Sequence, residues 1–395
     1  MQQIDLKELF YQYNPWWLGE MPVIATIERP TVLAPLYPLL KTRDVIMLSG
    51  LRRVGKTTTI KYLIRHLIQQ QKINPVLCFY ISMDDYQLKS ISIIDVINEY
   101  RKIMKITFQE KIFVFLDEIT YANDFQIQLK NLYDKENVKC IVSSSSSSLL
   151  KDDSAYLTGR KRIIEINPLN FEEYLLFKNI HVSFADRGLL DTYFLEYLRT
   201  GGIPEYVLHG DREYLMGLVD DIITKDIIAK HGIRQPGVIK EFFILLMEHA
   251  GKQISVNKIA NILKISVDSA KRYLTLFEET YLIHLMPRFG KTNEILLSTK
   301  KVYATDVGIR NAVVGFRDKG ALFENIVFMT IKQHQPRYLY QDQTEIDFIF
   351  NNTLLEVKYH AELNEKQMQL FDSFPARRKV ILKNYADFQK FLEHD

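Results

Sequence analysis

Apolar and polar positions in residues 44–166 form short apolar runs separated by longer stretches with helical periodicity. Short apolar runs bounded by polar residues are typical of buried strands. The predicted strands are Asp44–Leu48, Val76–Ile81, Ile112–Leu116, Cys140–Ser143 and Ile163–Ile166. Because strands that alternate with helices form parallel sheets covered on both faces, we expect an α/β fold around such a sheet.

The pattern changes four times along the chain and predicts five segments. Residues 1–40 are rich in aromatic residues and proline, and residues 41–170 carry the alternating pattern. Residues 171–234 read as helical, residues 235–305 as a small helical module that ends in a hairpin, and residues 306–395 as mixed helix and strand. No internal repeat and no long linker interrupts this order, so we expect several packed parts in one continuous chain.

The composition is that of an ordinary globular protein, with 47% hydrophobic and 25% charged residues. The 51 basic and 48 acidic residues give a formal net charge of +3, which excludes a polybasic nucleic-acid coat and leaves only a local patch for such binding. Cys78 and Cys140 lie in apolar segments and are expected to be buried free thiols. The N-terminal residues do not resemble a signal peptide, and no apolar run approaches the ~18 residues of a membrane helix, so we expect a cytoplasmic protein without a membrane partner.

The segment Gly50–Thr57 fits the pattern G-x-x-x-x-G-K-[ST] between an apolar strand and a helical stretch. In that context the pattern predicts a loop whose backbone N–H groups surround phosphates at a helix N-terminus. Lys56 is expected to reach the β- and γ-phosphates of ATP, and Thr57 to bind Mg²⁺ through its hydroxyl. The alternative is a plain glycine turn after a strand. The residues expected at the nucleotide are Gly50, Arg53, Val54, Gly55, Lys56, Thr57, Thr58, Asp117 and Ser143.

Two carboxylates, Asp117 and Glu118, end an apolar strand about 60 residues after this loop. Asp117 is expected to hold the water shell of Mg²⁺, and Glu118 to activate the attacking water as a general base, although acids also follow strands simply because strand ends are solvated. Ser143 opens a serine tract in which one hydroxyl could sense the γ-phosphate, unless the tract is only a flexible loop. Arg160 follows the tract and is expected either to stabilise phosphate charge, in cis or in trans, or to be a surface arginine.

Residues 254–283 have the apolar spacing of a helix–turn–helix, with Ser266 as the N-cap of the second helix and a wing expected from Leu282 to Tyr303. Between residues 251 and 305, nine residues are basic and four are acidic, which places positive charge where phosphate contacts would need it. The alternative is a protein-docking or purely structural module. The residues expected to contact DNA are Lys264, Lys271, Arg272, Arg288 and Lys291.

Near the C-terminus, two apolar strands flank an Asn351-Asn352 turn and predict a hairpin that carries Asp347, Glu356 and Lys358. Glu356 and Lys358 are two residues apart and share one face of their strand. Asp347 and Glu356 are expected to bind a metal ion, Lys358 to orient the nucleophile or stabilise charge, and Glu324, on a preceding helix, to face the same spot. Exposed charges on an ordinary hairpin are the alternative.

Together these motifs resemble a large bacterial and archaeal family of AAA-type ATPases, whose C-terminal part resembles a winged helix joined to a PD-(D/E)xK nuclease-like fold. The resemblance covers nearly the whole chain. It rests on Asn14–Trp17, Gly50–Thr57, Leu116–Glu118, the serine tract before Leu149-Leu150, Leu157–Arg160, Asn167–Phe171, Gly201–Glu205, Asp226, Asp306–Gly308, Glu324-Asn325, Asp347, Glu356 and Lys358.

The resemblance implies a role for each segment. Residues 1–40 would pack on the ATPase, residues 41–170 would be the AAA-type P-loop core, residues 171–234 a helical lid, residues 235–305 a winged-helix-like domain and residues 306–395 a restriction-endonuclease-like α/β domain. It also implies a nuclease site of Glu324, Asp347, Glu356 and Lys358, with Gln367 on the following helix. The chain departs from the family where Ile346 replaces the proline before Asp347 and where Ser143-Ser144 replaces the usual threonine-glycine.

We therefore expect a Mg²⁺-dependent protein that binds and hydrolyses ATP and binds DNA, with a metal-dependent DNA nuclease activity as a further hypothesis. The rival hypothesis is a nucleotide-dependent molecular switch that docks protein partners or its own copies, with the nuclease-like fold as a scaffold. A motor or remodeller would need pore loops, for which the sequence has no clear pattern. For the tryptophans in Asn14–Trp17, we favour packing on the core over a contact to adenine or to the lid.

Overall fold

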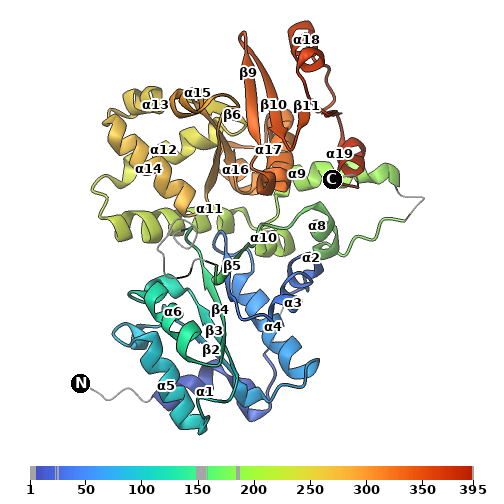
Figure 1. The fold of residues 1–395 in the computed structure, drawn as a ribbon. Coiled ribbons are helices and arrows are strands. Elements are labelled where there is room, and N and C mark those ends of the chain that lie inside the picture. The colour runs from blue at the N-terminus through green and yellow to red at the C-terminus, as the bar shows by residue number, and fades with distance from the viewer. Residues whose placement is uncertain are drawn as a thin grey trace. The chain divides into compact units, whose positions relative to one another are not determined.

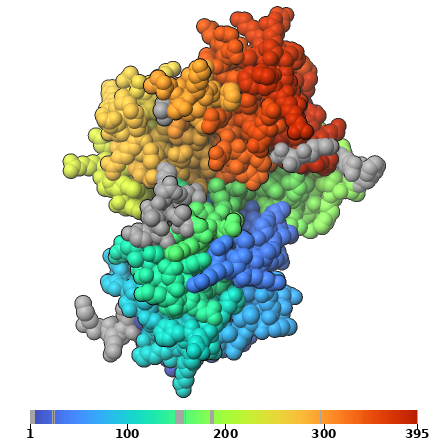
Figure 2. All heavy atoms as spheres, viewed as in Figure 1, coloured from blue at the N-terminus to red at the C-terminus, as the bar shows by residue number. Residues whose placement is uncertain are grey.

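The computed structural model describes residues 6–393 apart from residues 23, 25, 148–156, 158 and 184–186. Of the motif residues, Ser148, Leu149, Leu150 and Thr158 lie outside the described part of the chain. The chain splits into two compact units, Met1–Asn167 and Pro168–Asp395, which run from blue to green and from green to red in Figure 1 and Figure 2.

Unit 1 is an α/β unit built on one parallel sheet (Figure 1). Its strands are β1 (Val45–Ser49), β2 (Cys78–Ser82), β3 (Ile112–Asp117), β4 (Val138–Ser144) and β5 (Lys161–Glu165). Its helices are α1 (Leu6–Tyr13), a 3₁₀ turn Pro15–Leu18, α2 (Pro30–Leu33), α3 (Leu36–Leu39), α4 (Lys56–Gln69), α5 (Ile93–Met104) and α6 (Phe125–Lys135).

The five strands lie in the order β2-β3-β4-β1-β5, and every pair of neighbours is parallel. β1, β3 and β4 are buried along their whole length, as strands covered by helices on both faces must be. Each predicted strand is present, with ends within two residues of those expected, so the parallel sheet is confirmed.

The tryptophans of the N-terminal segment pack on the sheet. The indole N–H groups of Trp16 and Trp17 both donate to the backbone carbonyl of Cys78, at 2.9 and 3.1 Å. The Trp17 ring also stacks on Tyr100, with ring centroids 5.6 Å apart. These contacts support packing on the core over the alternative contact to adenine. Cys78 and Cys140 are buried free thiols, as expected, and burial raises the pKa of each thiol to about 12.

Unit 2 combines helices with two further sheets. Its helices are α8 (Phe171–Phe177), α9 (Leu190–Thr200), α10 (Pro204–His209), α11 (Arg212–Asp221), a π-helical segment Ile222–Ala229, α12 (Pro236–Glu248), α13 (Val256–Leu263), α14 (Val267–Glu279), α15 (Thr292–Leu297), α16 (Val307–Val314), α17 (Lys319–Ile331), α18 (Glu365–Ser373) and α19 (Tyr385–Leu392). Its strands are β6 (Lys252–Ile254), β7 (Ile283–Met286), β8 (Lys300–Ala304), β9 (Arg337–Gln341), β10 (Thr344–Phe350), β11 (Thr353–Val357) and β12 (Arg378–Leu382).

The first sheet of unit 2 belongs to the predicted helix–turn–helix. β8 lies between β6 and β7 and is antiparallel to both. α13 and α14 pack together beside it, and the Ser266 hydroxyl accepts the backbone N–H of Ser269 at 3.1 Å, so the predicted N-cap is confirmed. The expected wing contains the short helix α15 between β7 and β8. Whether this arrangement acts as a winged helix stays a prediction.

The second sheet carries the predicted nuclease motif. Its order is β12-β11-β10-β9, and β10 and β11 form the expected hairpin. Asn351 and Asn352 have φ of 43° and 60°, the left-handed pair of a tight two-residue hairpin turn. The register between β10 and β9 shifts between Ile346 and Ile349, so a bulge bends β10 where Asp347 lies.

Within unit 2, residues 171–234, expected as a lid, are hydrogen-bonded to residues 306–395. The carboxylate of Asp306 accepts the backbone N–H groups of Gly202 at 2.6 Å and of Ile309 at 3.0 Å. A Cβ atom on Gly202 would lie 2.1 Å from the carbonyl oxygen of Leu169, so only glycine fits there. Yellow residues of 235–305 and orange to red residues of 306–395 also lie against one another in both views (Figure 1, Figure 2).

Candidate functional site

The phosphate loop leaves β1 after Ser49 and enters α4 at Lys56. Gly50 has φ of +139°, and a Cβ atom on it would lie 2.3 Å from the carbonyl oxygen of Ile166, so the loop needs glycine there. The ammonium of Lys56 is buried and donates to the carbonyl oxygens of Gly50 at 2.9 Å and Leu51 at 2.8 Å. The loop therefore holds this charge at its own centre, where a phosphate would meet it.

Arg29 contacts the phosphate loop, and the sequence did not predict this contact. Its guanidinium donates to the carbonyl oxygens of Val54 and Asn167, each at 3.0 Å. An isolated arginine before a proline carries no sequence pattern that could have identified it. Arg53, in the same loop, has φ of 67°, and Thr58 lies in the first turn of α4.

Three hydroxyl groups converge on Asp117 at the end of β3. Its carboxylate, 3% exposed, accepts from Thr57 at 2.5 Å, from Tyr80 at 3.1 Å and from Ser143. Asp117 ends β3 and Thr57 follows β1, with β4 between these two strands, and both residues lie at the carboxyl edge of the sheet, as expected from their positions after parallel strands. A hydroxyl beside a carboxylate at a phosphate loop is the donor set that Mg²⁺ prefers, so the residues present fit that ion.

Glu118 follows in an uncommon backbone conformation, with φ of 48°. Its backbone N–H donates to the Ser143 hydroxyl at 3.1 Å, and its carboxylate accepts from the Ser145 hydroxyl at 3.1 Å. Ser143 thus contacts both acidic residues, because its hydroxyl also donates to Asp117. The structure therefore distinguishes Ser143 from the rest of the serine tract, which the sequence could not do.

Arg160 lies at the opposite edge of the sheet. It precedes the first residue of β5, beside the start of β1, whereas the phosphate loop follows the end of β1. The five residues of β1 separate these edges by roughly 16 Å. Arg160 pairs with Asp134 at 3.1 Å and stacks on the Tyr133 ring. This position gives no support to an action of Arg160 in cis, whereas its action in trans and its alternative role as a surface arginine both stay predictions.

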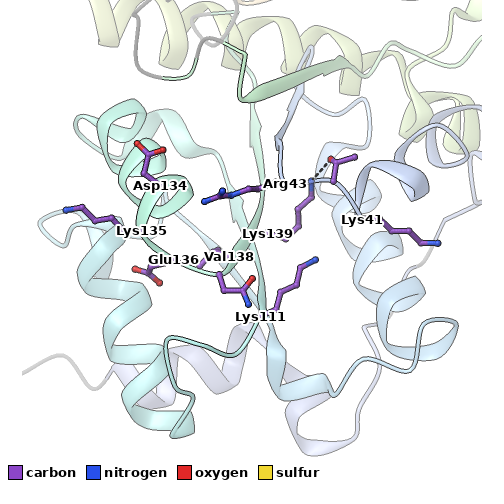
Figure 3. Close-up of a pocket in the computed structure, with 10 residues that line it drawn as sticks. Lys41, Arg43, Lys111, Asp134, Lys135, Glu136, Val138 and Lys139 are labelled. Atoms are coloured by element: carbon purple, nitrogen blue, oxygen red, sulfur yellow. Dashed lines mark hydrogen bonds between the residues drawn. The ribbon is translucent and has the colours of Figure 1, made fainter.

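A pocket of about 520 Å³ lies at the same far edge, where β1, β3 and β4 begin (Figure 3). Its lining mixes bases with acids: Lys41, Arg43, Lys111, Asp134, Lys135, Glu136 and Lys139. Lys139 is buried and donates to the carbonyl oxygen of Asp44 at 2.5 Å, and burial lowers its pKa to about 8. This pocket is not the nucleotide site.

In unit 2, the carboxylates of the nuclease motif do come together, as expected. The Glu356 carboxylate accepts the backbone N–H of Asp347 at 2.9 Å, and the Asp347 carboxylate accepts the backbone N–H of Val357 at 3.0 Å. Lys358 donates to Glu356 at 2.9 Å, and Gln367, on α18, also donates to it at 3.3 Å. The grouping of the motif residues is thus as the sequence predicts.

A lysine outside the motif enters this cluster. The ammonium of Lys301, on β8, lies 2.6 Å from Glu324, 2.8 Å from Glu345 and 3.1 Å from Asp347. Burial works against this charge, but the surrounding carboxylates outweigh burial and raise the pKa of Lys301 well above its ordinary value. Burial and the charge of Asp347 together raise the pKa of Glu356 to about 8.

The cluster does not fit a metal ion. In the part of the chain that the structure describes, no three His, Cys, Asp or Glu side chains are grouped to hold one. The oxygens of Asp347 and Glu356 accept protein N–H groups instead, as given above. The prediction of a metal site at Asp347 and Glu356 therefore lacks structural support.

The predicted DNA-contact residues differ in their accessibility. Lys264, Lys271 and Lys291 are exposed. Arg272 is also exposed and donates to the carbonyl oxygen of His231 at 2.9 Å. Arg288 is half-buried and donates to the carbonyl oxygen of Tyr340, so it holds β9 and is a poor candidate for a phosphate contact.

Comparison with known proteins agrees with the geometry of unit 1. Residues 42–175 match the AAA domain family, and residues 191–320 match a domain of unknown function, DUF8612. An uncharacterized protein of Methanocaldococcus jannaschii, MJ1544, is 33% identical over 343 residues, which cover 81% of this chain and 75% of that protein. An uncharacterized protein of Haemophilus influenzae is 27% identical over 341 residues, covering 82% of this chain and 84% of that protein.

Solved structures add little. The ORC2 protein of Aeropyrum pernix aligns with 81% of this chain and 98% of its own, at 9% identity and a TM-score of 0.39, which is too low to support an argument.

Among the described residues, no helix combines the length and the apolar character needed to cross a membrane. The relationship to MJ1544 shows the family: this chain belongs with that protein of M. jannaschii to one family, and within this chain residues 42–175 match the AAA domain.

Proposed function

We propose that this chain binds ATP with Mg²⁺ at the loop Gly50–Thr57 and hydrolyses it. The observation that carries the proposal is the 2.5 Å hydrogen bond between Thr57 and Asp117, because it brings together the two groups proposed to bind Mg²⁺, next to the buried Lys56. Bound Mg²⁺ would neutralise phosphate charge. Lys56 would exchange its contacts with the loop carbonyls for contacts with phosphate oxygens.

Glu118 is proposed as the general base. Glu118 follows Asp117 directly in the sequence. Its backbone N–H donates to the Ser143 hydroxyl, and its carboxylate accepts from the Ser145 hydroxyl. A carboxylate fixed in this way can orient a water molecule and accept its proton.

The variant Glu118→Gln tests this assignment, because it keeps the shape of the side chain and removes the base. We expect unchanged ATP binding by calorimetry and at least about a 100-fold loss of phosphate release, the range of general-base catalysis. Glu99→Gln, which alters a surface pair with Lys102 on α5, is the control and is expected to behave like wild type. Wild-type turnover in Glu118→Gln would exclude Glu118 as the base.

We further propose that the helix–turn–helix of α13 and α14 binds DNA. The support is the exposure of Lys264, Lys271 and Arg272 on one small module, in a region with more basic than acidic residues. Contacts of this kind act through phosphate charge, so the affinity should fall steeply as salt rises.

Replacement of Lys271 and Arg272 by alanine tests DNA binding. Fluorescence anisotropy with a labelled duplex should show weaker affinity and a salt dependence shallower by about 2 in log–log slope, since two phosphate contacts are lost. Lys225→Ala plus Lys240→Ala removes the same charge from surface pairs with Asp221 and Asp220 and is the matched control. Equal affinities in both double variants would exclude the proposed surface.

The second candidate is a nucleotide-dependent switch that docks a protein partner, with residues 306–395 as a scaffold. The observation that favours it is Lys301, which neutralises the carboxylates that a nuclease would need. This function predicts tight nucleotide binding without DNA binding, and a partner interaction that is insensitive to salt. The anisotropy experiment on the wild-type protein therefore separates the two candidates.

A further inference from the structure

The carboxylate cluster of unit 2 is organised around an internal cation. The Lys301 side chain is fully buried, and its ammonium contacts one carboxylate oxygen each of Glu324, Glu345 and Asp347. An ammonium has three N–H donors, and three acceptors surround it here within 3.1 Å. The hydrogen-bonding capacity of this group is therefore used in full.

The other oxygens of Asp347 and Glu345 accept hydrogen bonds from donors of the protein. The second oxygen of Asp347 accepts the backbone N–H of Val357 at 3.0 Å, and that of Glu345 accepts from Gln253 at 2.6 Å. The Lys301-bound oxygen of Glu324 also accepts from Tyr303 at 2.7 Å. A divalent ion would need several of these oxygens turned toward it at about 2.0–2.6 Å, and it would lie next to the ammonium.

Lys301 cannot easily withdraw from this position. It lies on β8, the central strand of its sheet, where its backbone is paired with Gln253 on β6 and with Met286 on β7. Removing one partner from such a buried ion pair leaves an uncompensated charge, which is strongly unfavourable. The backbone pairing and the buried ion pairs therefore hold the ammonium among the carboxylates.

We propose that the Lys301 ammonium permanently takes the place of a metal ion in this cluster, so that the D…ExK motif serves as a metal-independent link between the two sheets of unit 2. Residues 306–395 then do not act as a metal-dependent nuclease. This inference does not depend on the proposed ATPase, because every residue in it belongs to unit 2.

The test is a titration of nucleotide-free protein with Mn²⁺ at pH 8, followed by electron paramagnetic resonance of the free ion. We compare wild type, Lys301→Met, and Lys301→Met plus Asp347→Asn. Methionine keeps the length of the side chain and removes its charge. We expect Lys301→Met to gain one Mn²⁺ site at least about tenfold tighter than any in wild type, and the double variant to lose it.

Two outcomes would overturn the proposal. One is a Mn²⁺ site in the wild-type protein that disappears in the single variant Asp347→Asn. The other is a folded Lys301→Met protein that gains no site. If Lys301→Met does not fold, the comparison of wild type with Asp347→Asn still tests the proposal. Equal Mn²⁺ binding by these two proteins supports it. A Mn²⁺ site that is present in wild type and absent from Asp347→Asn refutes it.

A nuclease assay gives an independent readout. Wild-type protein incubated with plasmid DNA and Mg²⁺ or Mn²⁺ should leave the DNA intact. Metal-dependent cleavage that is abolished by Glu356→Ala would overturn the proposal, because it would show a working metal site in the same cluster.

Discussion

Removal of the Ser143 hydroxyl should slow ATP hydrolysis much more than it weakens ATP binding. This hydroxyl accepts the backbone N–H of Glu118 at 3.1 Å and donates to the Asp117 carboxylate. It touches none of the loop groups that surround Lys56, as far as the described contacts extend. In Ser143→Ala the phosphate site should therefore remain, while the proposed base loses its support.

The magnitude follows from the backbone of Glu118. A left-handed conformation, here with φ of 48°, costs a non-glycine residue about 1–2 kcal/mol, and the bond to Ser143 offsets this cost. Without that bond, a partly buried N–H also lacks its acceptor, at a cost of about 1–3 kcal/mol. If about 1.4–2.8 kcal/mol of these two costs destabilises the conformation in which Glu118 acts as the base, kcat falls about 10- to 100-fold.

The assay is steady-state phosphate release, combined with calorimetric ATP affinity. We expect the lower kcat with an ATP Kd within about threefold of wild type. Ser144→Ala is the matched control, since Ser144 lies next on the same strand and contacts Thr120 and Ser146 instead. A kcat for Ser143→Ala within about twofold of wild type would show that the Ser143 contacts do not position Glu118.

Two further changes test the phosphate loop and the hydrogen bonds that Asp306 accepts from Gly202 and Ile309. Lys56→Ala should weaken ATP binding about 100-fold, or about 2.7 kcal/mol, in calorimetry, whereas Lys61→Ala on the same helix should not. Burial raises the pKa of Asp306 to about 6, from 3.8, so the folded protein binds more protons between these values. Its stability should therefore fall by on the order of 2–3 kcal/mol as pH rises from 4 to 6, and urea unfolding of Asp306→Asn should lack this slope.

Much of unit 1 could be predicted because parallel strands are buried on both faces. Such strands appear in the sequence as uninterrupted apolar runs, and their carboxyl ends meet at one edge of the sheet. The meeting of Thr57, Asp117 and Ser143 follows from that rule alone. Arg160 shows its limit: it comes soon after the serine tract in the sequence, but it precedes a strand, and parallel strands begin at the opposite edge.

The helix–turn–helix shows a second limit. The spacing of apolar residues predicted α13, α14 and the Ser266 cap, because local hydrogen bonds and helical periodicity determine them. The count of basic residues was less informative. It included Arg288, which holds a neighbouring strand, and Lys301, which is buried, and neither is available to DNA as the structure stands.

Lys301 could not be recognised from the sequence because its partners are distant and its own strand does not mark it. In β8 it follows the exposed Lys300 and precedes apolar residues, so a reader counts both lysines as surface charge. The motif D…ExK likewise specifies the carboxylates but not the cation that they hold, which here comes from 46 residues before Asp347. A metal ion and an ammonium are alternative solutions to the same electrostatic problem, that of carboxylates brought together under burial. It follows that a related chain with an apolar side chain in place of Lys301, and the same carboxylates, should bind a divalent ion where this chain does not.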